Sequence, residues 1–259
     1  MESKNNKIKI AICIPMKSER DWIHLSDCHL LTTFLPSFLR TCERRKYDYT
    51  FYLGYDKGDA FFEKYHNELK KRFLPDDKLF CKDGFRGNPC GYWNYLFKQA
   101  FKDGNDYLAQ YGDDISIISN NWTTYFVNIL REHGDFGVCG GCDTRYWIER
   151  LERGQIGILE NIFIHKSHFD YFNTVFDKRL KTWWSDDYIS NLYNNYTYCC
   201  PNIRYRNVNR VGDSNNKSRY TPDQKDGDLW QNYVKDTYKS IKNKSTLPKD
   251  FVDFITSSI

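Results

Sequence analysis

Two hydrophobic patterns alternate along the first half of the chain. Short apolar runs bounded by turn residues, of which KIKIAICIP is the first, are typical of buried strands. We expect such strands at Lys7–Pro15, Tyr49–Tyr55, Lys78–Cys81, Asp106–Tyr111 and Asp135–Gly140. Longer stretches with an apolar face at helical spacing predict helices over Ser26–Lys46, Asp59–Phe73, Gly91–Phe101 and Trp122–His133. Pro36 should kink or split the first of these helices, because proline lacks the N–H that a helix interior needs.

This alternation of strands and helices predicts an α/β fold with a mostly parallel sheet and right-handed crossovers. In open sheets of this kind, ligands bind at the carboxyl ends of the strands. Four segments should therefore meet at one edge, namely Lys17–Trp22, Asp56–Asp59, Arg86–Gly91 and Gly112–Asp114. The second half is less regular, with a strand expected at Gly157–His165 and helices at Asp186–Asn194 and Asp228–Ile241.

The charges of the chain are mixed in sign. Its 259 residues, enough for one large domain, include 38 basic and 34 acidic side chains, which give a formal net charge of +4. A duplex-binding protein carries a stronger and more clustered basic excess, so we expect no nucleic-acid partner. A single anionic ligand, such as a nucleoside diphosphate, needs only a few local cations.

Cysteine usage indicates a reducing compartment. Nine cysteines are present, an odd number, and the polar start MESKNNK lacks the apolar core of a signal peptide. No apolar run is long enough to span a membrane. We therefore expect free thiols in the cytoplasm, or in the host cytoplasm if the protein is viral. Cys139 and Cys142 have the spacing of zinc ligands, but no second pair completes the four ligands of a structural site, which favours a strand-end turn.

The tetrapeptide YGDD at 111–114 has three interpretations: a polymerase metal hairpin, a metal site for a sugar nucleotide, or a plain turn. A polymerase needs a second aspartate set upstream to complete a two-metal clamp. The nearest candidates, Asp56 and Asp59, are too closely spaced for that set. The 110 residues before Tyr111 are also too few for the earlier polymerase motifs. The polymerase interpretation is therefore disfavoured.

A sugar-nucleotide transferase accounts better for the same tetrapeptide. When the bond between a sugar and a nucleoside diphosphate breaks, Mg²⁺ or Mn²⁺ held by carboxylates neutralises the leaving group. Asp113 and Asp114 follow a predicted strand and suit that role. A separate carboxylate must deprotonate the acceptor hydroxyl, and the segment WWSDDY at 183–188 supplies two acids. The alternative for that segment is helix capping, with Ser185 or Asp186 as the N-cap.

The order of these segments resembles that of glycosyltransferases with the GT-A fold, and most of all the inverting, family-2-like group. The resemblance covers residues 7–195 and rests on IAICIPMKSERDW at 10–22, FYLGYDKGD at 51–59, GNPCGYWNYLFKQA at 87–100, DYLAQYGDDI at 106–115, ENIFIHKSHFDYF at 160–172 and WWSDDYISNLY at 183–193. The layout is also similar to uncharacterised transferases of protists and large DNA viruses. It implies one domain over 1–259, with a nucleotide-binding half at 7–120, an acceptor-side half at 121–225 and a helical tail at 226–259.

The resemblance implies transfer of a sugar from a nucleoside-diphosphate donor, with a UDP-sugar favoured, to a glycan or other hydroxyl acceptor, with inversion. Asp187 would be the catalytic base, with Asp186 as the alternative. The residues implied for the donor are Pro15, Met16, Lys17 and Arg20 in the nucleotide loop, Asp56 at the base or ribose, and Arg86, Asn94 and Asp113 at the diphosphate or sugar, while Trp183 and Trp184 are implied for the acceptor sugar.

The metal site departs from the family pattern in two ways. Asp114 would be the main ligand of Mn²⁺ or Mg²⁺ and Asp113 a second, but the first acid of the family's Asp-x-Asp motif aligns with a glycine. No histidine follows His168, so the late metal-binding histidine of many relatives is absent. Asn209, Asp213 or the phosphates themselves could take its place.

Several alternatives stay open. A sugar-phosphate nucleotidyltransferase would carry a glycine-rich basic loop after the first strand, and IPMKSERDW has no glycine. A non-catalytic sugar-nucleotide-binding module is the second alternative, because an acid of the metal motif is missing. Asp56 could act only as the cap of the following helix. The loop VGDSNNKSRY, which includes Lys217, Arg219 and Tyr220, could close over the diphosphate or remain a plain surface loop.

Overall fold

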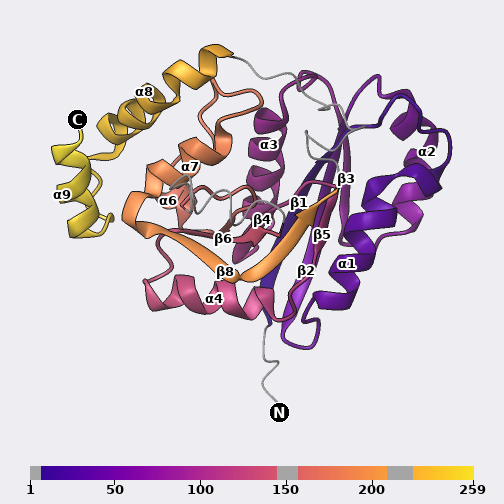
Figure 1. The fold of residues 1–259 in the computed structure, drawn as a ribbon, viewed down its shortest axis with the longest axis horizontal. Helices are drawn as coiled ribbons and strands as arrows, with labels where there is room; N and C mark the ends of the chain where they lie inside the picture. The colour runs from indigo at the N-terminus through magenta and orange to yellow at the C-terminus, as the bar shows by residue number, and fades with distance from the viewer. Residues whose placement is uncertain (1–6, 145–156, 209–223) are drawn as a thin grey trace.

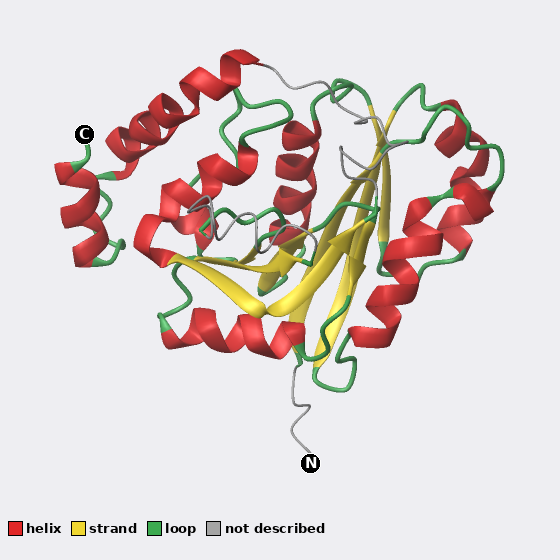
Figure 2. Ribbon diagram, viewed as in Figure 1, coloured by secondary structure: helices red, strands yellow, loops and turns green. Residues whose placement is uncertain are grey.

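The computed structural model describes residues 7–144, 157–208 and 224–259. Over these residues, eight strands form one sheet with helices on both faces (Figures 1 and 2). The strands are β1 Ile8–Met16, β2 Tyr47–Asp56, β3 Lys78–Lys82, β4 Tyr107–Gln110, β5 Ile115–Ile117, β6 Val138–Asp143, β7 Phe163–His165 and β8 Thr197–Asn207. The helices are α1 Leu35–Thr41, α2 Ala60–Lys71, α3 Pro89–Lys102, α4 Trp122–Glu132, α6 His168–Tyr171, α7 Ser185–Tyr193, α8 Gln224–Ile241 and α9 Lys249–Ser257.

The sheet is mostly parallel, as predicted, and its strand order is β3-β2-β1-β4-β7-β6-β8-β5. Strand β1 pairs in parallel with β2 and β4, β2 with β3, and β6 with β8. Strand β7 runs antiparallel between β4 and β6, and β5 runs antiparallel to β8 at the end of the sheet. The carboxyl ends of β1, β2, β3, β4, β6 and β8 consequently lie along one edge.

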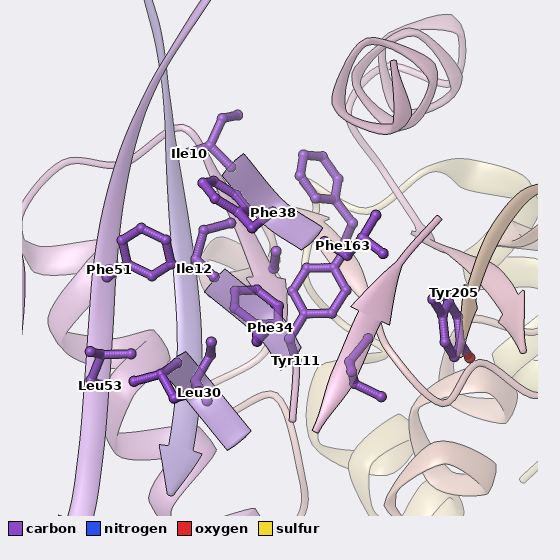
Figure 3. Packing of buried hydrophobic residues seen from close by; sticks show 14 of the residues in the cluster. Ile10, Ile12, Leu30, Phe34, Phe38, Phe51, Leu53, Tyr111, Phe163 and Tyr205 are labelled. Carbon is purple, nitrogen blue, oxygen red and sulfur yellow. The ribbon is translucent and has the colours of Figure 1, made fainter. Parts of the chain in front are cut away.

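Strand β1 divides the core into two apolar layers. Ile10, Ile12 and Ile14 face one layer and Ala11 and Cys13 face the other, because successive side chains of a strand point to opposite faces. Helices α1, α2 and α4 cover the first layer, in which Figure 3 shows an aromatic cluster. Helices α3, α7, α8 and α9 cover the second layer. Both faces of the central strands are therefore buried.

The predicted first helix is split near its proline. A π-helical turn at Leu30–Phe34 leads directly into α1, and Pro36 lies in the first turn of α1. The proline ring crowds the carbonyl four residues earlier, and the wider π turn relieves that contact.

The second half contains elements that the sequence pattern did not predict. Strand β7 occupies only the last three residues of the expected strand Gly157–His165. Strands β5 and β8 were not expected, and α9 is a separate helix within the range expected for the helical tail. Strand β8 contains Pro201 within an irregular stretch of its pairing with β6, and proline cannot donate to a ladder. No helix in the described part of the chain is long and apolar enough to cross a membrane.

A buried histidine joins α6 to α7. His168 is 1% exposed. Its Nδ1 lies 2.7 Å from the Tyr193 hydroxyl and its Nε2 lies 3.1 Å from the Thr174 carbonyl. Burial in this apolar layer lowers the pKa of His168 to about 4, because it disfavours the charged imidazolium.

We expect this histidine to make the fold sensitive to acid. The pKa of His168 is lower in the folded state than in the unfolded chain, so its contribution is fully present above pH 6.5 and is lost as pH falls toward 4. Between pH 7.5 and 4.5 the free energy of unfolding should fall by about 2 to 3 kcal/mol more in the wild type than in His168→Gln. Urea unfolding of both proteins at the two pH values measures this difference. Equal losses would show that His168 is not the titrating group.

Candidate functional site

The YGDD tetrapeptide leaves the sheet at the edge where the parallel strands end. Gln110 pairs with Cys13, and β1 then continues for three residues to Met16. The Tyr111 ring is buried against Phe34, as Figure 3 shows, and against Trp122, with centroids 5.4 and 5.8 Å away. Tyr111 therefore anchors the tetrapeptide in the core, and the residues after it turn toward the edge.

The two carboxylates of the tetrapeptide are both buried. Asp113 is 1% exposed and Asp114 is 7% exposed. A Cβ atom added at Gly112 would lie 2.5 Å from Oδ1 of Asp114. The missing side chain thus makes room for the Asp114 carboxylate, and an acid at position 112 would force Asp114 into another orientation. Gly112, which aligns with the first acid of Asp-x-Asp, is therefore the residue that permits the present orientation of Asp114.

Hard carboxylate oxygens are the ligands that Mg²⁺ and Mn²⁺ prefer, so Asp114 and Asp113 are the residues here that would hold such an ion. Within residues 7–144, 157–208 and 224–259, no group of three or more His, Cys, Asp or Glu side chains is arranged to hold a metal ion. Mg²⁺ in phosphate sites is commonly held by one or two carboxylates plus the phosphates, and two acids are sufficient for that mode. The expected substitutes Asn209 and Asp213 lie outside the described residues.

Cys139 is buried, and Cys142 Sγ lies 3.3 Å from Cys199 Sγ.

The loop after β1 is fastened to the loop after β2. Asp59 accepts hydrogen bonds from the Ser18 N–H at 3.0 Å and from the Ser18 hydroxyl at 2.8 Å. It also accepts the Phe62 N–H at 3.1 Å as the N-cap of α2. Asp59 therefore performs the capping role that the sequence left open for Asp56.

Asp56 ends β2 with a carboxylate oxygen that lacks a hydrogen-bond donor among the described residues. Its Oδ1 is buried and has no hydrogen-bond partner among the described residues. Burial raises the pKa of Asp56, as does the charge of Asp59, whereas Lys17 and Arg86 act in the opposite direction. A buried carboxylate oxygen is costly unless a donor reaches it. A ligand N–H or O–H at this edge would supply that donor.

The other residues expected at the donor differ in how exposed their side chains are. Pro15 and Met16 are buried within β1, so the loop that faces the edge begins at Lys17. Lys17 is half-buried, and Arg20 is exposed in the turn that follows. Arg86 is exposed in the loop between β3 and α3.

The Asn94 amide is bonded to the backbone of a distant segment. Its Oδ1 accepts the N–H groups of Val175 and Phe176, and its Nδ2 donates to the Phe176 carbonyl at 2.8 Å. These bonds hold the main chain at residues 175–176 against α3, while the donor-binding role expected for Asn94 stays a prediction.

The acceptor-side segment is tied to the start of α3. The Cys90 N–H donates to the Lys181 carbonyl at 3.1 Å, and Cys90 Sγ lies 3.2 Å from the Thr182 carbonyl oxygen. Trp183, which follows, is 42% exposed and offers a free aromatic face. Trp184 is instead packed against α8, where a Cβ at Gly227 would come within 2.9 Å of its ring. Of the two tryptophans, Trp184 is thus used in packing, and Trp183 is the one with an exposed side chain.

Asp186 and Asp187 lie in the first turn of α7, and both are half-buried. The N-cap of α7 is Trp184, with a left-handed φ of 71° and no side-chain cap. The expectation that Ser185 or Asp186 caps this helix is therefore wrong. The two acids are held on α7 next to the segment that contacts α3.

Two acids at the same edge were not singled out from the sequence. Asp143, 5% exposed, ends β6. Glu160 accepts a hydrogen bond from the Tyr205 hydroxyl at 3.3 Å. An acid directly after a strand was the signal used for Asp113 and Asp114, and the same rule applied to DFGVCGGCD would have identified Asp143. The segment with Lys217, Arg219 and Tyr220 lies outside the described residues.

The sequence matches no protein-family model and no curated protein. The fold, in contrast, is shared with solved structures. The S. aureus TarS fragment 1–349 has a TM-score of 0.54 at 12% identity, over 96% of this chain and 69% of that chain. Its complex with UDP-GlcNAc has a TM-score of 0.55 at 14% identity, over 97% and 71%. At these identities the similarity establishes the fold, and the predicted GT-A-like architecture is confirmed.

We expect the hydrogen bonds from Ser18 to Asp59 to contribute measurably to the free energy of unfolding. Asp59→Ala removes the α2 cap and both bonds to Ser18, which should lower the free energy of unfolding by about 1 to 2 kcal/mol. Ser18→Ala should cost less, because the backbone N–H bond remains. A double-mutant cycle by urea unfolding should give a coupling energy of about 0.5 to 1.5 kcal/mol. Additive effects would mean that the hydroxyl does not contribute to the contact.

Proposed function

We propose that this chain is a glycosyltransferase that moves a sugar from a nucleoside diphosphate, UDP by preference, to a hydroxyl acceptor with inversion. One observation carries the proposal: Asp113 and Asp114 are buried at the end of β4, on the edge where Asp56 holds an oxygen without a partner among the described residues. The fold supports it, since S. aureus TarS has the same architecture and has been crystallised with UDP and with UDP-GlcNAc.

The nucleotide would bind across the ends of β1 and β2. Asp56 would accept a hydrogen bond from a base N–H or a ribose hydroxyl, which would satisfy its buried oxygen. The positive charges of Lys17 and Arg86 already act on Asp56 from the two flanking loops. The same cations would lie near the diphosphate and offset part of its charge.

The diphosphate would extend from there toward Asp113 and Asp114. These residues would hold Mn²⁺ or Mg²⁺, which would neutralise the negative charge that develops on the leaving phosphate oxygen. The Tyr111 anchor and the side-chain-free position 112 fix the backbone and the orientation of the Asp114 carboxylate.

Asp187 would act as the base, with Asp186 as the alternative. Its carboxylate would take the proton of the acceptor hydroxyl while the hydroxyl oxygen forms a bond to the anomeric carbon. The bond from that carbon to the phosphate oxygen breaks in the same step, and the nucleoside diphosphate departs with the electron pair. One displacement of this kind inverts the anomeric configuration. Trp183 would support the apolar face of a sugar ring beside the base.

Calorimetry with UDP tests the donor site. The wild type should bind UDP more tightly with Mn²⁺ than with a chelator, and Asp114→Ala should lose about tenfold or more of the Mn²⁺-dependent affinity. Gly112→Ala should show the same loss without unfolding, because the added methyl group displaces only the end of the Asp114 side chain. Gly157→Ala is the matched control, since a Cβ there meets no atom of the described residues within 4 Å. If the wild type binds no nucleoside diphosphate, the transferase proposal is wrong.

Nucleotide release from a panel of UDP-sugars and acceptors tests the base. Asp187→Asn should reduce turnover by a factor of about 10² to 10⁴, because general-base assistance is lost, while the dissociation constant for UDP stays unchanged. Asp186→Asn should retain most of the activity. The reverse result would assign the base to Asp186. Full activity in both variants would exclude this segment from the chemistry.

A further inference from the structure

Strand β8 lies between β6 and β5, and it extends further than β6 toward the edge where the donor is proposed to bind. Asp143, the last residue of β6, is opposite Tyr205 of β8. On its other side, β8 continues to Asn207, which is opposite Ile115 of β5. Among the described residues, the register of β8 with β6 thus ends at Tyr205, whereas its register with β5 extends to Asn207.

The side chain of Asp143 bonds to β8 beyond the residue that it faces in the register. The Thr144 N–H donates to the Tyr205 carbonyl at 2.9 Å. Two residues further along β8, the Asn207 N–H faces the same side and donates to Oδ2 of Asp143 at 2.9 Å. The Asp143 carboxylate thus adds a side-chain hydrogen bond to the backbone bonds between β6 and β8.

The residue that follows β8 bonds to the YGDD tetrapeptide. The Val208 N–H points to the opposite side and donates to the main-chain carbonyl of Asp114 at 3.0 Å. Consecutive residues of a strand direct their N–H groups to opposite neighbours, so whatever fixes Asn207 also fixes Val208. The Asp143 carboxylate and the Asp114 main-chain carbonyl thus accept hydrogen bonds from two consecutive N–H groups, those of Asn207 and Val208.

We propose that Asp143 is a positioning residue for the metal-binding carboxylate. Its buried carboxylate holds the end of β8, and β8 fixes the main chain of Asp114. A bond from an N–H to a charged carboxylate is stronger than one to a neutral acceptor, and Asp143 is 5% exposed, which limits competition from water. The inference rests on the proposed function for the role of Asp114, but the bond itself can be tested without nucleotide or metal.

Amide hydrogen exchange of the unliganded protein, followed by NMR, is the first test. In Asp143→Ala the Asn207 and Val208 amides should exchange about tenfold faster than in the wild type, because the local opening energy falls. In Asp143→Asn, which keeps an acceptor oxygen, both rates should stay within about threefold of the wild type. Should the alanine variant not fold, Asp143→Ser, whose shorter side chain falls short of Asn207, replaces it. Unchanged exchange at both amides would overturn the proposal.

A matched control is available at the opposite edge of the sheet. Asp77 accepts the Phe51 N–H at 2.7 Å and the Leu74 N–H at 2.8 Å next to the start of β3. Asp77→Ala removes a comparable bond between a carboxylate and a strand, far from the donor edge. It should leave the exchange of the Asn207 and Val208 amides unchanged, and a rise there would show a global loss of stability.

UDP calorimetry links the bond to the site. Asp143→Ala should lose about tenfold of the Mn²⁺-dependent UDP affinity, with UDP affinity in chelator unchanged, whereas Asp77→Ala should alter neither. Faster exchange with full Mn²⁺-dependent affinity would overturn the positioning role. A wild type that binds no UDP would overturn the proposed function instead, and the exchange experiment distinguishes that failure from a failure of the bond.

Discussion

The burial of β1 on both faces is the constraint on which the rest of the structure depends. Its large side chains, Ile10, Ile12 and Ile14, fill the layer under α1, α2 and α4, and each contributes about 2 kcal/mol on burial. Its small side chains, Ala11 and Cys13, face the other layer and let α3 approach the sheet closely. This asymmetry brings the start of α3 to the edge where the parallel strands end.

Two hydrogen bonds between residues far apart in the sequence join the halves of the chain at that edge. The bond from Cys90 to the Lys181 carbonyl attaches the acceptor-side segment to α3. The bond from Val208 to the Asp114 carbonyl attaches β8 to the metal motif. The donor and acceptor parts of the proposed site therefore share one rigid sheet edge, which suits a direct displacement that needs three groups in fixed positions.

The first half of the fold could be predicted because its elements follow local hydrophobic periods. Strand β8 could not, since Pro201 and the shifted register hide its pattern. Within the site, the sequence located the strand-end acids at 56 and 113–114. It could not distinguish Asp56 from Asp59 as the helix cap, because only two residues separate them and both precede the helix. Asn94 and Trp184 depend on partners about 80 and 43 residues away, at Phe176 and Gly227, which no local pattern reveals.

The position of β5 in the sheet has a consequence for the order of folding. Strand β5 has three residues, and β8 is its one partner among the described strands, through Ile115 opposite Asn207 and Ile117 opposite Tyr205. A strand this short has no stability of its own, and contacts between segments far apart in sequence are slow to form. The main-chain support of Asp114 is thus among the last contacts to be completed. During synthesis, the parallel strands β1 to β4 would assemble first, and the carboxylate motif would stay unsupported until β8 emerges and pairs with it.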